Sequence, residues 1–177
     1  MGSPLRERLE RDVVVAVKAR DENRRDTLRF VLAAVKNESI FRLQQAIDRL
    51  IAEGKDEAAR RVWLDANAPA ALDDRAVLDV LQKQAKMRRD SIEAFEKAGR
   101  ADLVAREGAQ LAVIVEYLPA QLDAETIRAI VQRVVGETGA SGPRDMGKVM
   151  PKVLAETKDR ADGKAVAAVV SELLKGS

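Results

Sequence analysis

Positively charged side chains gather at two places in this sequence, where they could bind an anionic ligand. The first group begins in the stretch RDMGKVMPKV, residues 144–153, and its candidates are Arg144, Lys148, Lys152, Lys158, Arg160 and Lys164. The second lies in KQAKMRRDS, residues 83–91, where Arg88 and Arg89 are secondary candidates. Lysine and arginine bind phosphate oxygens through charge and hydrogen bonds. Both groups therefore predict contacts with a nucleic-acid backbone.

The remaining side chains exclude most enzyme chemistry. The chain has no histidine and no cysteine, which rules out histidine bases, cysteine nucleophiles, disulfides and ordinary zinc sites. It contains no GxxxxGK[ST] or GxGxxG phosphate loop. The adjacent carboxylates Asp73 and Asp74 fit a helix cap better than an acid–base pair. We expect no catalytic residue, no cofactor and no metal site.

The overall charge is nearly balanced, with 31 Lys and Arg against 29 Asp and Glu. Nucleic-acid binding must therefore come from local clustering of cations rather than from the net charge. The charged N-terminus has no apolar signal core, and no apolar run is long enough to span a bilayer. These features predict a cytosolic protein without a membrane segment. They leave its oligomeric state open.

Apolar periodicity and composition predict helices throughout the chain. Aromatic residues make up only 3% of it, and no useful strand alternation occurs. Ser3 followed by Pro4 predicts the start of one helix, and Asp21 the start of a second that is either continuous to Gly54 or bent. The apolar stripe of this second helix runs on to Ile51. We expect an all-α fold: an N-terminal helical bundle or pair of hairpins over residues 3–118, with an inserted segment at about 42–72, and a small three-helix tail over residues 120–176.

The helical spacing gives each group of cations a structural context. Lys148 and Lys152 share a face only if the helix continues through Pro151, because a proline inside a helix kinks it or starts a new turn. The exposed N-termini of short helices nearby would add to phosphate binding. Core filling is the expected role of the apolar positions in the same stretch: Met146, Val149, Met150 and Val153.

Arg88 lies at the edge of a predicted buried stripe that includes Leu81, Met87 and Ile92. Two interpretations stay open for it. Either its stem covers the core while its head pairs with an acid on a neighbouring helix, or it faces a ligand.

Several motifs in fixed order resemble the YqeY family, the stand-alone relatives of the tail of GatB, a subunit of the glutamine-dependent tRNA amidotransferase. The motifs are KNESI, LQKQAKMRRDSIEAFEKAGRADLVAREGAQLAVIVEYLPAQL, DMGKVMPKV and DRADGKAVAAVVSELL. The likeness covers nearly the whole chain apart from about 42–72, which is longer than the family's usual link, and the motif positions carried over are 145–150 and 160–164. Pro151 departs from the small residue expected there.

The resemblance implies a two-part helical fold and, at most, the tRNA-facing role of the GatB tail. The cradle that carries the amidotransferase chemistry is absent, so a carbon–nitrogen ligase label would describe the parent complex only. Our leading hypothesis is therefore an accessory module without a catalytic site that binds tRNA or a tRNA-processing enzyme. The alternative is a protein–protein adaptor that receives a partner helix in an apolar groove and makes no RNA contact. An amidotransferase or amidase in its own right is the least favoured hypothesis.

Overall fold

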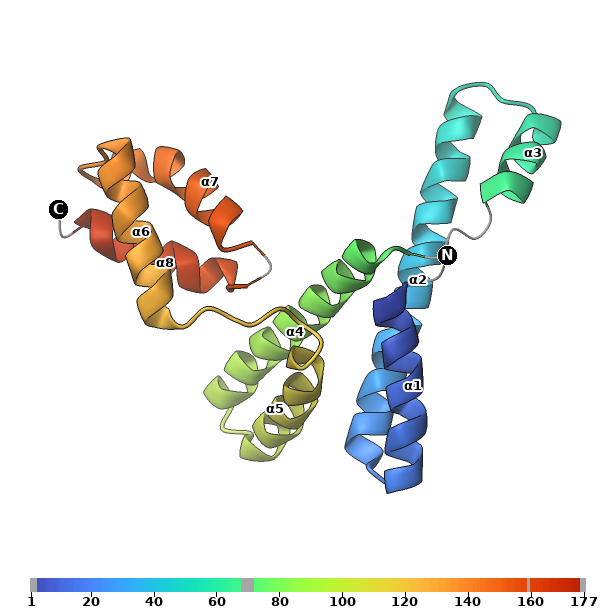
Figure 1. Cartoon of the computed structure of the whole chain (residues 1–177), viewed down its shortest axis with the longest axis horizontal. Coiled ribbons are helices and arrows are strands. Elements are labelled where there is room, and N and C mark those ends of the chain that lie inside the picture. The colour runs from blue at the N-terminus through green and yellow to red at the C-terminus, as the bar shows by residue number, and fades with distance from the viewer. Residues whose placement is uncertain (1–2, 68–71, 159, 176–177) are drawn as a thin grey trace. The chain divides into compact units, whose positions relative to one another are not determined.

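The computed structural model describes residues 3–67, 72–158 and 160–175, and in these residues helices are the only regular structure (Figure 1). The predicted all-α fold is confirmed. The chain divides into two compact units, Met1–Tyr117 and Leu118–Ser177. Within the described ranges, no helix combines the length and the apolar character needed to cross a membrane.

Helices α1 (Pro4–Ala19) and α2 (Glu22–Ala52) pack against each other as a hairpin in the N-terminal unit. Both begin at the predicted caps: Ser3 Oγ accepts from the Arg6 N–H at 3.1 Å, and Asp21 Oδ1 accepts from the Arg24 N–H at 2.9 Å. These bonds satisfy N–H groups that have no partner inside the helix. Helix α2 is one continuous helix of 31 residues, which decides between the two alternatives that the sequence left open.

Only the first half of α2 contributes to the core. Leu28, Val31 and Val35 are 0–2% exposed, whereas Ile40 and Ile51 are 54% and 50% exposed. Helix α1 has 16 residues against 31 in α2, so the hairpin covers only about half of the longer helix. The apolar stripe that runs on to Ile51 therefore continues past the end of the partner helix, and its last part lies outside the core.

Helices α3 (Glu57–Asn67), α4 (Asp74–Lys97) and α5 (Ala101–Val115) complete the N-terminal unit. Helix α3 lies in the segment expected to be an insertion, part of which, residues 68–71, is outside the described residues. Helices α4 and α5 form a second hairpin, and α4 packs on α1 and α2 (Figure 1). Asp73 caps α4 by accepting from the Ala76 N–H at 2.8 Å. Four helices thus supply the buried apolar side chains, which include Leu9, Ala16, Leu28, Val31, Val77, Leu81, Ala85 and Ile114.

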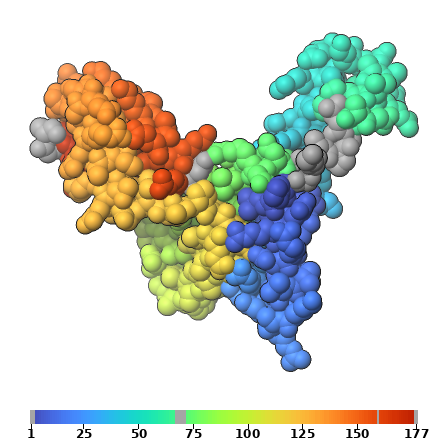
Figure 2. All heavy atoms as spheres, in the orientation of Figure 1, coloured from blue at the N-terminus to red at the C-terminus, as the bar shows by residue number. Residues whose placement is uncertain are grey.

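The C-terminal unit consists of α6 (Ala124–Thr138), a 3₁₀ turn η1 (Pro143–Asp145), α7 (Met146–Glu156) and α8 (Gly163–Lys175). The three α-helices pack as one body, coloured orange to red in Figure 2. Their shared core is apolar: Ile127, Val131, Val134, Ala140, Val149, Val153, Val166, Val170 and Leu174. Met146 and Met150 pack against it and are partly buried, as predicted.

Candidate nucleic-acid interface

Helix α7 continues through Pro151 without interruption. Proline has no N–H to donate to the carbonyl four residues earlier, and its ring crowds that carbonyl. Here that residue is Gly147, and both it and Pro151 are exposed. A Cβ on Gly147 would meet no atom within 4 Å, so the space around the affected turn is open. Lys148 and Lys152 are therefore one helical turn apart on the same exposed face.

The two lysines differ in their ionic partners. Lys148 Nζ donates to Asp145 Oδ1 at 2.7 Å, and Asp145 Oδ2 also accepts from the Ser141 N–H at 3.1 Å. The hydrogen bond from Lys148 is the main reason that the pKa of Asp145 is lowered. In the part of the chain that the structure describes, no carboxylate pairs with Lys152 or with the exposed Arg144. Helix α7 thus carries more cationic charge than its neighbours neutralise.

The turn between α7 and α8 brings Lys158 and Arg160 to the surface. Arg160 also has a structural role: its carbonyl accepts from the Leu122 N–H at 2.7 Å, and its Nε donates to the Ala120 carbonyl at 3.3 Å. These bonds fix the turn to the segment that precedes α6. Substitution of Arg160 would therefore change the fold of this turn as well as its charge.

The start of α8 is already capped. Asp162 Oδ1 accepts from the N–H groups of Lys164 and Ala165 at 2.8 and 3.3 Å. A carboxylate therefore occupies the position at which a bound anion would accept from the first turn of the helix. A contribution of this N-terminus to phosphate binding stays a prediction, and the exposed Lys164 side chain lies beside it.

Arginines elsewhere in the C-terminal unit are neutralised by nearby acids. Arg128 pairs with Glu172 at 2.6 Å, and Arg133 pairs with Glu137 at 2.7 Å and with Glu156. Exposed pairs of this kind contribute little to stability, but they cancel charge locally. In the described part of the C-terminal unit, the exposed cations that no carboxylate pairs with thus include Arg144, Lys152 and Lys158.

The arginines of the second predicted group are less exposed than the lysines of α7. Arg88 is only 7% exposed, and Arg89 is half-buried. The Arg88 Nη1 donates to the Gln84 carbonyl at 3.4 Å and to its Oε1 at 3.2 Å, and the guanidinium lies 5.1 Å from the centre of the Phe30 ring. Burial lowers the pKa of Arg88. No carboxylate of the described chain forms an ion pair with it, so the interpretation with an acid partner is wrong.

Sequence reasoning missed a polar cluster between α1, α2 and the end of α5. The Tyr117 hydroxyl donates to Asp12 Oδ2 at 2.5 Å and accepts from Arg24 Nη2 at 3.3 Å. Arg24 also binds both carboxylate oxygens of Glu116, at 2.9 and 2.8 Å. Burial, followed by the hydrogen bond to Asp12, raises the pKa of Tyr117 to about 12. The only signal in the sequence was that this tyrosine is the single one in the chain.

The sequence model of the family described as Yqey-like protein matches residues 55–174. The chain belongs to this family. The match begins at residue 55 and so includes the later part of the segment expected to be an insertion.

Three curated relatives, each named "Altered inheritance of mitochondria protein 41, mitochondrial", are similar to this YqeY-like protein. That of Lachancea thermotolerans is 33% identical over 138 residues, 76% of this chain and 60% of the relative. That of Pyrenophora tritici-repentis is 34% identical and covers 57% of each chain. That of Kluyveromyces lactis is 26% identical over 153 residues, 82% of this chain and 69% of the relative. The chain spans little more than half the length of the first two.

These relatives correct one prediction. The cytosolic location expected from the sequence is contradicted, because the relatives are named as mitochondrial proteins. That expectation rested on the lack of an apolar signal core, which bears on secretion. Mitochondrial targeting uses amphipathic, arginine-rich segments instead, so a missing apolar core carries no information about that compartment.

Proposed function

We propose that this YqeY-like protein is an accessory tRNA-binding module without a catalytic site of its own, and that its C-terminal unit contacts the tRNA backbone. The names of its relatives extend the proposal to a mitochondrial setting. The main support is the continuity of α7 through Pro151, which gives Lys148 and Lys152 one exposed face. Arg144, Lys158 and Lys164 extend the cationic surface on either side along the chain.

Such a surface binds phosphates and does not read bases. Exposed lysines on one helix face supply charge and flexible donors, which position an RNA backbone without choosing a sequence. With about two to four phosphate contacts, the slope of log affinity against log salt would be about −2 to −3.5. The near-neutral net charge of +2 adds little long-range attraction, so we expect micromolar affinity that weakens steeply with salt.

A mobility-shift assay with bulk tRNA at low and at moderate salt tests this proposal. We expect binding by the wild type in low salt and its loss in the variant Lys148→Glu plus Lys152→Glu. The matched control is Lys18→Glu plus Lys36→Glu, which makes the same change of charge on exposed helical positions of the N-terminal unit. Absence of binding by the wild type at micromolar protein in low salt would contradict the proposal, as would equal losses in the two variants.

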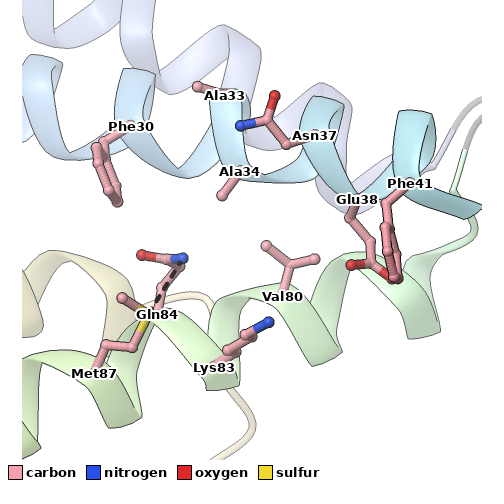
Figure 3. A pocket seen from close by; sticks show the side chains of 10 residues that line it. All are labelled: Phe30, Ala33, Ala34, Asn37, Glu38, Phe41, Val80, Lys83, Gln84 and Met87. Carbon is pink, nitrogen blue, oxygen red and sulfur yellow. Dashed lines mark hydrogen bonds between the residues drawn. The ribbon is translucent and has the colours of Figure 1, made fainter.

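A second candidate function, a protein–protein adaptor, is favoured by one observation. A groove of about 510 Å³ between α2 and α4 is lined by the side chains of Phe30, Phe41 and Met87, which are 52%, 57% and 50% exposed (Figure 3). A groove with an apolar lining is the kind of surface that accepts the apolar face of an amphipathic helix. Affinity capture after nuclease treatment distinguishes the two functions, because an adaptor keeps its partner and an RNA-dependent complex loses it.

A further inference from the structure

A second cavity, of about 380 Å³, lies between α2, α4 and α5 in the N-terminal unit. It shares two lining residues, Phe30 and Met87, with the groove between α2 and α4 shown in Figure 3. Its size is within the range typical of pockets for small organic ligands. Unlike the larger groove, it is lined by the buried Arg88.

Arg88 leaves one edge of its guanidinium without a partner. Its Nη1 is used by Gln84, whereas its Nε is inaccessible to solvent and has no hydrogen-bond partner in the described structure. Among the described residues, its Nη2 has no hydrogen-bond partner either. The N–H groups of Nε and Nη2 point the same way and form a fork suited to two oxygen atoms.

Two other arginines of this chain show what this edge binds. Arg25 donates from Nε and Nη2 to the two carboxylate oxygens of Asp26 at 2.7 and 3.0 Å. Arg100 binds Asp102 in the same way at 2.9 and 2.7 Å. At both positions the Nε–Nη2 edge binds a carboxylate, whereas at Arg88 no described residue is bonded to the same edge.

A second buried donor without a partner lines the same cavity. Thr27 is 1% exposed, and its Oγ1 has no hydrogen-bond partner in the described residues. Buried side-chain donors are rarely left unsatisfied, and here two of them, from α2 and α4, border one space. An oxygen-rich group that displaced the side chains now covering these two atoms would satisfy both.

The remaining lining residues define the rest of the ligand. Asp26 already pairs with Arg25. Arg106 adds a second cation to the lining and, unlike Arg88, it is exposed. Glu107 is the competing acid: it attracts Arg88 electrostatically without forming an ion pair in the described structure. The half-exposed side chains of Phe30 and Met87, in contrast, would cover an apolar group. Met87, predicted to lie on the buried face, is exposed because it lines this space.

We propose that the cavity binds a small organic oxyanion, a carboxylate or phosphate monoester carried on an apolar group. The oxyanion accepts from the Nε–Nη2 edge of Arg88 and from the Thr27 hydroxyl, and the apolar group lies on Phe30 and Met87. This site is independent of the proposed tRNA surface, which belongs to the other unit.

Titration of the ¹⁵N-labelled wild type with four probes tests the site, with the Arg88 Nε–Hε signal as the readout. Benzoate and phenyl phosphate represent the two anionic classes, inorganic phosphate lacks the apolar group, and benzyl alcohol lacks the charge. We expect saturable shifts of the Arg88 signal with benzoate or phenyl phosphate, weaker ones with inorganic phosphate and none with benzyl alcohol. The proposal is overturned if neither organic anion moves this signal at millimolar concentrations.

Variants then assign the contacts. Because Arg88→Met removes the Arg88 signal itself, binding to the variants is followed by the backbone amide signals of the residues that line the cavity. Arg88→Met should weaken binding of the better probe by about tenfold or more, since hydrogen bonds to charged groups are the stronger class. Thr27→Val should weaken it a few-fold, and Glu107→Gln should strengthen it by removing the competing acid. Arg89→Met is the matched control on the neighbouring position and should bind as the wild type does. Unchanged binding in Arg88→Met, or an equal loss in Arg89→Met, would overturn the assignment.

Discussion

The interiors of the two units differ in how many polar side chains they bury. In the C-terminal unit the core is apolar, and the one buried polar residue of its described part, Thr157, donates to the Val153 carbonyl at 2.8 Å. In the N-terminal unit Ser3, Thr27, Gln84 and Arg88 are all buried. One unit keeps its charge outside, while the other keeps a cation inside.

This difference bears on how each unit could bind a ligand. Surface lysines cost the fold little, and they give contacts that salt weakens. A buried guanidinium loses hydration worth several kcal/mol, which only good partners restore. The exposed lysines of the C-terminal unit can therefore be changed without loss of the fold. The stability of the N-terminal unit depends in part on the hydrogen bonds of its buried polar side chains.

The largest expected effect is on the apolar core of the C-terminal unit. Leu174→Ala removes a side chain that is 1% exposed, and such truncations cost about 2–5 kcal/mol. We expect urea denaturation followed by circular dichroism to show this loss, while the fluorescence of Trp63, in the N-terminal unit, keeps its midpoint. The half-buried neighbour Leu173→Ala is the control and should cost less. An equal shift of the Trp63 transition would show that the two units are not independent in stability.

The polar interior of the N-terminal unit is tested by Tyr117→Phe. The change removes hydroxyl bonds to the charged groups of Asp12 and Arg24, each of a class worth about 1.5–3 kcal/mol. We expect a loss of about that size in total, because solvent partly replaces the bonds to Asp12. Here the Trp63 transition should move and that of the C-terminal unit should not. A neutral effect would mean that the cluster adds nothing to stability.

The same hydroxyl should make the N-terminal unit sensitive to alkali. The pKa of Tyr117 is raised to about 12 in the folded protein, against an ordinary value of 10.0. The stabilisation by the neutral phenol is therefore fully present below pH 10 and is lost as the pH rises from 10 through 12. Because the chain has one tyrosine, the near-ultraviolet absorbance of phenolate reports this titration directly. Ionisation at the ordinary pKa in the folded protein would contradict the burial of this hydroxyl.

A smaller, stabilising effect is expected at Gly147 in α7. A Cβ there meets open space and the residue is helical, so Gly147→Ala should add about 0.5–1 kcal/mol. Gly139→Ala is the opposite control, because a φ of 62° places it in the left-handed region that favours glycine. Chemical denaturation of the C-terminal unit measures both changes. A loss of stability at Gly147 would show that the turn around Pro151 needs the glycine.

The smallest expected effect is on tRNA affinity, when the ion pair between Lys148 and Asp145 is removed. Asp145→Asn removes the paired charge while leaving an oxygen that can accept from the Ser141 N–H. Exposed ion pairs are worth at most about 1 kcal/mol, so tRNA affinity should rise by up to about fivefold. Glu125→Gln, an exposed position in the first turn of α6, removes the same charge as a control. Equal gains in both variants would point to net charge rather than to Lys148.

Local features of this fold were predictable and distant ones were not. The caps at Ser3, Asp21 and Asp73 follow from side chains three residues away from the N–H groups they bind. The burial of Val149 and Val153 follows from helical period. In contrast, the hydroxyl of Tyr117 finds its partners 105 and 93 residues away. No spacing rule reaches that far.

The candidate sites show the same limit. That Lys148 and Lys152 share a face depended on one residue, Pro151, whose effect is set by whether the affected turn faces solvent. Whether the Nε–Nη2 edge of Arg88 finds an acid partner depends on which acids the packing of α4 and α5 brings near it. Periodicity placed Arg88 at the edge of the core, but the choice between an acid partner and a cavity is made by tertiary structure.

Helix α2 joins two environments without a break in its backbone hydrogen bonds. The amides around Leu28 to Val35 lie in the core, and their exchange with solvent deuterium should require opening of much of the unit. Among the described residues from 42 to 52 none is buried, so amides there should exchange through fraying from the Ala52 end. A single helix would then show a gradient of protection along its length. The slow half lies in the core of the unit, and the fast half extends beyond that core.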